Sequence, residues 1–223
     1  MKKTWIVAIL LVVAVIIAGL IIVLVSKEKG QNDLLTAEIN ALSESNTNTE
    51  VKTTGQYGIV EKLIKEDYKL YIDSINTLRA NYEKLASAKV INLDTYQKDG
   101  PEFEESLGLL NGIKQENAEL ISKLEAIVDE AKIEETIRAN GLESRYADMY
   151  KDILGQIKLA DGIASLKETD AKYDAYNDSL IAVLDYMKAN KGEWFIENNT
   201  LKSKSQTFID EYNELVKKTN VEL

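Results

Sequence analysis

The sequence contains no cysteine, no histidine and one proline among its 223 residues. Without a thiol or an imidazole the chain cannot form a Ser-His-Asp triad, a cysteine nucleophile, a Cys/His zinc site or an iron–sulfur cluster. It also lacks the GxxxxGK[ST] and GxGxxG segments that cradle phosphate groups. We therefore expect no metal, no cofactor and no enzymatic activity, and only carboxylate, lysine, hydroxyl and tyrosine chemistry remains.

Basic residues are in the minority along most of the chain. Residues 31–223 carry 23 Lys and Arg against 36 Asp and Glu. Nucleic acids and anionic headgroups are bound mainly through positive side chains that neutralise phosphate. The acidic balance therefore predicts no nucleic-acid partner for this part of the chain.

One long apolar run interrupts this polar sequence, at residues 5–25 (WIVAILLVVAVIIAGLIIVLV). As a helix it would be about 31 Å long, enough to cross a hydrocarbon core of roughly 30 Å. The run is longer than the apolar region of a cleaved signal peptide, and no Ala-x-Ala site precedes Ser26. The sequence therefore predicts an uncleaved signal anchor, a transmembrane helix that contacts the lipid bilayer through residues 5–25.

Charges flank this run evenly, with Lys2 and Lys3 before it and Lys27 and Lys29 after it. The short N-terminal tail adds an α-amino charge, and Glu28 reduces the positive charge on the far side. We expect residues 1–4 to form a cytoplasmic tail of a single-pass cell-membrane protein. The rest of the chain is then expected outside the cytoplasm.

Residues 26–56 are predicted to form a stalk and a flexible tether. An apolar stripe continues from the anchor to about Ser43, with Gly30 as a weak point. The stretch from Ser43 to Gln56 has one apolar residue and is rich in Ser, Thr and Asn. Such a composition buries too little apolar surface to favour a fixed structure.

From Tyr57 to Leu85 apolar residues recur every three or four positions, which is the stripe of a helix packed on one face. Similar stripes cover residues 101–140, 142–163, 165–190 and 194–215. We predict an all-α fold, in which the transmembrane helix precedes an antiparallel, coiled-coil-like bundle of four to five long amphipathic helices over residues 57–223.

Local signals predict where these helices begin and end. After a loop at residues 91–100, Pro101 suits the first position of a helix, and Asn140-Gly141 suits a left-handed cap at its end. Ser165 with Glu168 matches a capping box at the start of another helix, which Asn190-Lys191-Gly192 should stop. Residues 193–201 are predicted as part of the last helix, with a hairpin turning at Asn198-Asn199 as the alternative.

Tyrosines lie on or beside the stripes where leucine would pack more simply, and the chain has 11 of them. A tyrosine hydroxyl needs a hydrogen-bond partner or water, so such a seam either borders the core or lines a ligand cleft between helices. The residues proposed for a cleft are Tyr71, Tyr82 and Tyr146. Asn117, on the stripe at residues 101–140, is expected to set the helix register or to face solvent.

Trp194, Phe195 and Ile196 form a second candidate site, because they place three large apolar side chains directly after a predicted helix stop. Exposed, they would form a contact site for a partner; buried, they would cap one end of the bundle. Asp170, Asp174 and Asp178 share one helical face, as do Asp148 and Asp152. A solvated acidic surface explains both sets without catalysis.

These features favour a single-pass, membrane-anchored, extracytoplasmic helical protein that acts as a non-enzymatic binding or scaffold module of the cell envelope. Its partner would be an unknown envelope protein, and Ala14 and Ala18 leave a homodimer through the anchor open. The alternative is a sensory accessory subunit that binds a small molecule in the tyrosine-rich cleft. A third hypothesis is a glycan-cleaving enzyme that uses two carboxylates. No motif points to a named family.

Overall fold

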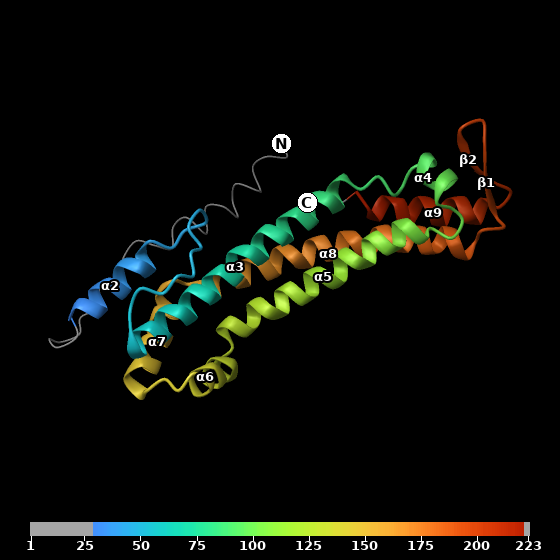
Figure 1. Ribbon diagram of the computed structural model, residues 1–223. Coiled ribbons are helices and arrows are strands. Elements are labelled where there is room, and N and C mark those ends of the chain that lie inside the picture. The colour runs from blue at the N-terminus through green and yellow to red at the C-terminus, as the bar shows by residue number, and fades with distance from the viewer. Residues whose placement is uncertain (1–28, 221–223) are drawn as a thin grey trace. The chain divides into compact units, whose positions relative to one another are not determined.

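The computed structural model describes residues 29–220, which are mostly helical (Figure 1). Eight helices, α2 to α9, and a two-stranded hairpin follow one another in this range. The predicted tail at residues 1–4 and the predicted anchor at residues 5–25 lie outside the described residues. None of the helices within residues 29–220 has the length and hydropathy of a membrane span.

The helices are α2 Lys29–Asn40, α3 Gly55–Ser87, α4 Leu93–Lys98, α5 Glu104–Val128, α6 Glu130–Ala139, α7 Ser144–Gln156, α8 Leu159–Ala189 and α9 Gln206–Lys218. The strands are β1 Trp194–Glu197 and β2 Thr200–Ser203. The prediction of a mostly helical, bundle-like protein is confirmed for the described residues.

The chain divides into two compact units. Among the described residues, unit 1 consists of 29–77 and 120–167, and unit 2 of 78–119 and 168–220. The three longest helices, α3, α5 and α8, each have residues in both units (Figure 1). Along the chain α3 and α8 run from unit 1 into unit 2, whereas α5 runs the opposite way.

Unit 1 is organised around the first part of α3. Tyr150 of α7 donates a hydrogen bond to Asp67 of α3, and Gly162 of α8 lies under the Tyr71 side chain. The apolar face of α2 belongs to the same unit, because Leu35 and Ile39 are buried. The predicted stalk is therefore a packed element within residues 29–42.

Two helix boundaries in unit 1 differ from the prediction. The helix predicted over residues 101–140 is interrupted at Asp129, whose carboxylate accepts a hydrogen bond from Lys132 N at 2.9 Å and so caps a new helix, α6. The helix predicted to start at Ser165 begins earlier, at Leu159, because buried apolar residues continue through Ile163 and hold the chain helical.

The predicted left-handed end of the helix at Asn140-Gly141 is confirmed. Gly141 has a φ of 61°, and its N–H donates to Arg138 O at 3.2 Å. Leu142 N donates to Ile137 O at 3.1 Å. These two bonds make a Schellman motif, which satisfies the last carbonyl groups of α6.

Unit 2 differs from the prediction before α5. The predicted loop at residues 91–100 contains the short helix α4, capped by the Asn92 side chain, which accepts from Thr95 N. Pro101 is not the first residue of the next helix, because α5 begins only at Glu104. The Asp99 carboxylate caps α5 instead, accepting hydrogen bonds from the backbone of Glu105 and Ser106 at 3.1 and 2.8 Å.

The hairpin alternative for residues 193–201 is correct, and the prediction of helix there is wrong. Strands β1 and β2 pair antiparallel, with Trp194 opposite Ser203 and Glu197 opposite Thr200. Asn198 and Asn199 have φ values of 50° and 57°. Two positive φ angles are what a two-residue type I′ turn requires, and Asn tolerates them better than most residues.

Gly162 of α8 gives a test of the packing in unit 1. A Cβ atom at this position would lie 2.1 Å from the Tyr71 hydroxyl oxygen, and Tyr71 is too deeply buried to swing aside. We expect Gly162→Ala to lower the free energy of unfolding by about 1–3 kcal/mol, as overpacking does. Denaturant unfolding of residues 29–220 measures this change.

Two variants separate the clash from the effect of alanine itself. Tyr71→Phe removes the clashing oxygen, so Gly162→Ala should be tolerated in that background. Gly155→Ala in α7 meets nothing within 4 Å and should stabilise the helix by about 0.5–1 kcal/mol. Equal destabilisation by Gly162→Ala in both backgrounds would contradict the observed packing.

Candidate functional site

Tyr71 and Tyr146, proposed for a ligand cleft, are buried in unit 1. Tyr71 is 1% exposed and Tyr146 7% exposed. The Tyr146 ring meets the Tyr57 ring edge to face, with centroids 5.1 Å apart, and the Arg145 guanidinium lies 5.4 Å from the Tyr146 centroid. Burial raises the pKa of Tyr71 to about 12. Both rings are therefore parts of a filled interior.

Tyr82, the third proposed cleft residue, belongs to unit 2. Its ring stacks on Tyr173 with centroids 4.1 Å apart, and its hydroxyl donates to Asp170 at 2.9 Å. Asn117 donates to the same Asp170 oxygen at 3.1 Å and accepts from Asn81 at 2.9 Å. Burial raises the pKa of Asp170 above its usual value, and the hydrogen bonds from Tyr82 and Asn117 offset this shift only in part.

This hydrogen-bond network shows the role of Asn117 and distinguishes Asp170 from the other aspartates on its helical face. Asn117 is buried and hydrogen-bonded between helices, which agrees with the register-setting role and not with the solvent-facing one. Asp170 differs from Asp174 and Asp178, because it bonds to buried partners while they pair with Lys114. The acidic face predicted along α8 is therefore solvated only in part.

The cluster at Trp194, Phe195 and Ile196 is split by the alternation of strand β1. Trp194 and Ile196 pack against the core of unit 2, and Phe195 is 42% exposed on the other face. The Trp194 ring lies near Tyr96 and Phe103, and its Nε1 donates to Met187 O at 2.8 Å. Two of the three residues thus cap this core, and only Phe195 is available for contact.

A cluster of buried charges in unit 1 was not predicted from the sequence. Lys65 is 2% exposed and its Nζ donates to Glu61, Glu38 and the Glu50 carbonyl at 2.7, 2.8 and 2.6 Å. All three ammonium protons are therefore hydrogen-bonded. The spacing of Glu61 and Lys65, four apart beside the stripe positions 60 and 64, is the signal that could have revealed the pair.

The Glu61 carboxylate is fully buried and binds the segment that precedes α3. It accepts hydrogen bonds from Lys52 N at 3.1 Å, from Thr53 N at 2.7 Å and from Thr53 Oγ1 at 2.6 Å. Burial alone would raise the pKa of Glu61, but the bonds from Lys65 and Thr53 outweigh it and hold the pKa below its usual value.

This cluster corrects the predicted flexible tether at residues 43–56. Glu50, Lys52 and Thr53 are tied to α3, and Thr54 N donates to Gln31 of α2 at 2.7 Å. Its polar composition predicts no fixed structure, because it has too few apolar side chains to bury. The segment is instead fixed by hydrogen bonds to buried charges, which composition alone does not reveal. We call Glu38, Glu61 and Lys65, with the backbone that they bind, the ion clamp.

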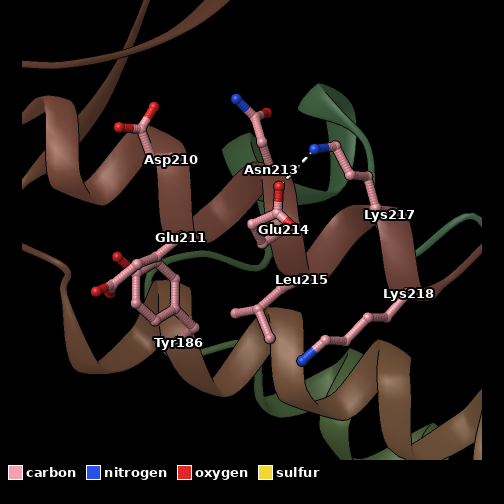
Figure 2. Close-up of a pocket in the computed structure, with 8 residues that line it drawn as sticks. All are labelled: Tyr186, Asp210, Glu211, Asn213, Glu214, Leu215, Lys217 and Lys218. Carbon is pink, nitrogen blue, oxygen red and sulfur yellow. Dashed lines mark hydrogen bonds and ion pairs between the residues drawn. The ribbon is translucent and has the colours of Figure 1, made fainter.

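Two open recesses lie in unit 2, on either side of α9. Figure 2 shows the first, a hollow of about 560 Å³ between α9 and Tyr186 of α8. Tyr186 stands beside Glu211, while Leu215 and Lys218 point from α9 toward α8 (Figure 2). Burial and the Glu211 and Glu193 carboxylates raise the pKa of Tyr186 to about 12. The first recess thus has an apolar floor and a charged rim.

The second recess is larger, with a volume of about 1120 Å³. Its apolar lining includes Leu93 of α4, Leu180 of α8 and Val216 of α9, and Lys89 and Asp94 contribute charges. Leu215 and Val216 are neighbours on α9, so the same short stretch of helix borders both recesses. Neither recess is lined by Tyr71, Tyr82 or Tyr146.

Acidic side chains are the remaining candidates for catalysis among the described residues. Within residues 29–220 no three or more acidic side chains are grouped to hold a metal ion. Asp67 is the carboxyl with the most altered acidity, because burial raises its pKa to about 6 despite the 2.6 Å hydrogen bond from Tyr150. It faces a buried tyrosine within unit 1, and neither recess includes it.

Comparison with known proteins finds no matching family model, no similar curated protein and no similar solved structure.

The split of the aromatic cluster predicts a large loss of stability at one position and a small change at the position next to it. Trp194→Ala removes ring contacts and a hydrogen bond, so we expect it to lower the free energy of unfolding by about 2–3 kcal/mol. Phe195→Ala on the exposed face should change it by less than about 0.5 kcal/mol. Thermal and denaturant unfolding measure both. Equal effects at the two positions would rule out the observed orientation of β1.

Asp67 predicts a dependence of stability on pH. Its pKa is about 6 in the folded protein against an ordinary value of 3.8, so the folded state holds the proton more tightly. This favours folding below pH 4, and the advantage disappears as the pH rises to 6. Asp67→Asn cannot titrate, so wild type should lose on the order of 2–3 kcal/mol relative to this variant between pH 4 and 7.

The measurement is denaturant unfolding of both proteins at several pH values. Asp152→Asn, which removes an exposed carboxylate that does not contribute to the Asp67 shift, is the control and should show the wild-type pH dependence. A constant difference between wild type and Asp67→Asn from pH 4 to 7 would show that Asp67 has an ordinary acidity.

Proposed function

We propose that this protein is a single-pass, membrane-anchored helical module, exposed outside the cytoplasm, that binds a partner of the cell envelope and catalyses no reaction. The proposal for the anchor rests on residues 5–25, which form the one long uncharged apolar run of the sequence. The N-inside orientation rests on the short basic tail in front of that run.

The observation that carries the binding role is the pair of recesses beside α9. Apolar floors with charged rims are typical of surfaces that bind other proteins. In contrast, the unusual polar groups elsewhere in the described residues face one another: Lys65 binds two carboxylates, Asp170 binds Tyr82, and Asp67 binds Tyr150. These groups support structure, whereas Leu215 and Val216 are only partly buried and line the two recesses.

The alternative of a sensory subunit depended on a cleft formed by Tyr71, Tyr82 and Tyr146. Each of these side chains is more than nine-tenths buried, and Tyr82 and Tyr146 are covered by other aromatic rings. No contact among the described residues favours a ligand there. The binding module therefore remains the better-supported hypothesis.

The absence of native cysteine permits a test with single-cysteine variants of the full chain in cells. We replace Asn213, which lines the first recess, and Leu70, an exposed residue of α3 in unit 1 that serves as the control. A membrane-impermeant, thiol-reactive photocrosslinker should label both positions in intact cells. After illumination a protein adduct of defined size should form from Asn213→Cys and not from Leu70→Cys.

Each step of this experiment can contradict a different part of the proposal. Labelling that requires permeabilised cells would overturn the extracytoplasmic location. Recovery of the protein in the aqueous fraction would overturn the anchor. Illumination that gives no adduct from Asn213→Cys, or the same adduct from Leu70→Cys, would overturn the recess as the contact surface.

A further inference from the structure

The ion clamp lies in the part of the described chain that follows the apolar run most closely. Val25, the last residue of that run, and Lys29, the first residue of α2, are four positions apart in the sequence. Four residues span at most about 14 Å even when fully extended. If residues 5–25 cross a bilayer, α2 therefore begins close to the membrane surface.

The clamp joins α2 to α3 through charges withdrawn from water. Glu38 of α2 accepts from Lys65 of α3 at 2.8 Å, and its other oxygen binds Lys52 at 2.8 Å. Hydrogen bonds from Lys52 and Lys65 hold the pKa of Glu38 below its usual value. Glu38 therefore stays charged at neutral pH, and separating α2 from α3 would remove one of the two carboxylate partners of the buried Lys65 ammonium group.

The clamp also fixes the segment between the two helices. Lys65 binds the Glu50 carbonyl, and Glu61 binds the backbone of Lys52 and Thr53. A free chain of this length would let the bundle turn independently of its anchor. The contacts remove that freedom at residues 50–53, next to the start of α3.

From these contacts we infer that the ion clamp couples the membrane anchor to the bundle. It locks α2, the first described helix after the proposed anchor, onto α3, so unit 1 is held close to the bilayer. A partner that reaches unit 1 must then approach within the same membrane region. This inference rests on the proposed anchor, and it assigns to Glu38, Glu61 and Lys65 a role in positioning the module.

The test uses the full chain in lipid nanodiscs, with spin labels on Asn40→Cys and Leu70→Cys. These positions are exposed on α2 and α3 of unit 1. Pulsed electron paramagnetic resonance should give one narrow distance population. Glu38→Lys places a like charge opposite Lys65 and should broaden it.

Two further readouts accompany the distances. Asp33→Lys makes the same charge change at an exposed position of α2 and should leave the narrow population intact. In the Glu38→Lys variant the amide exchange rate of α2 should rise by about 100-fold, while that of α3 residues 68–77 stays unchanged.

A broad distance population in the protein without the Glu38 change would overturn the inference. A distance population in Glu38→Lys as narrow as that of the Asp33→Lys control would also overturn it. Separate flotation of the protein with vesicles tests the anchor itself. A protein that fails to float but keeps a narrow distance population would contradict the proposed anchor alone. Flotation with a broad population would contradict the clamp alone.

Discussion

The ion pair between Lys65 and Glu61 is the constraint on which unit 1 depends. The two side chains are 2% and 0% exposed, and removing such charges from water is costly unless every donor and acceptor is satisfied. The remaining hydrogen-bond partners of this pair lie outside α3: they are a carboxylate of α2 and three backbone groups of the preceding segment. The pair is therefore stable only while Glu38 and residues 50–53 stay in place, and the pair in turn holds them there.

Apolar periodicity predicts helices well and their ends poorly. The stripe from Tyr57 onward predicted α3 because each turn buries a residue of the same face. The breaks at Asp129 and Lys158 were not predicted, because each depends on a local conformation: a carboxylate that accepts a single backbone N–H, and a residue with a φ of 51°. The hairpin was predicted only as an alternative, since the spacing of Trp194, Ile196 and Leu201 fits both a helix and a strand. The turn at Asn198-Asn199 in the structure decides between them.

The candidate sites were harder to predict than the fold. The exclusion of thiol and imidazole chemistry follows from composition alone. Whether Tyr71 lines a cleft or fills a core depends on which helix covers it, and the helix that does so presents Gly162 there. The recesses beside α9 likewise need the path of the chain between residues 89 and 220, which no local pattern contains. The ion clamp had one local signal, the Glu61 and Lys65 spacing, but its α2 partner comes from 27 positions away in the sequence.

The central claim is that residues 50–54 are a fixed part of the molecule and not a tether. Hydrogen exchange of the full chain at neutral pH tests it most directly, because Lys52 N and Thr53 N donate to a buried carboxylate in a stretch that lacks regular secondary structure. The account predicts that these two amides exchange as slowly as those of α2. Exchange of both amides at the rate of an unfolded peptide would contradict it.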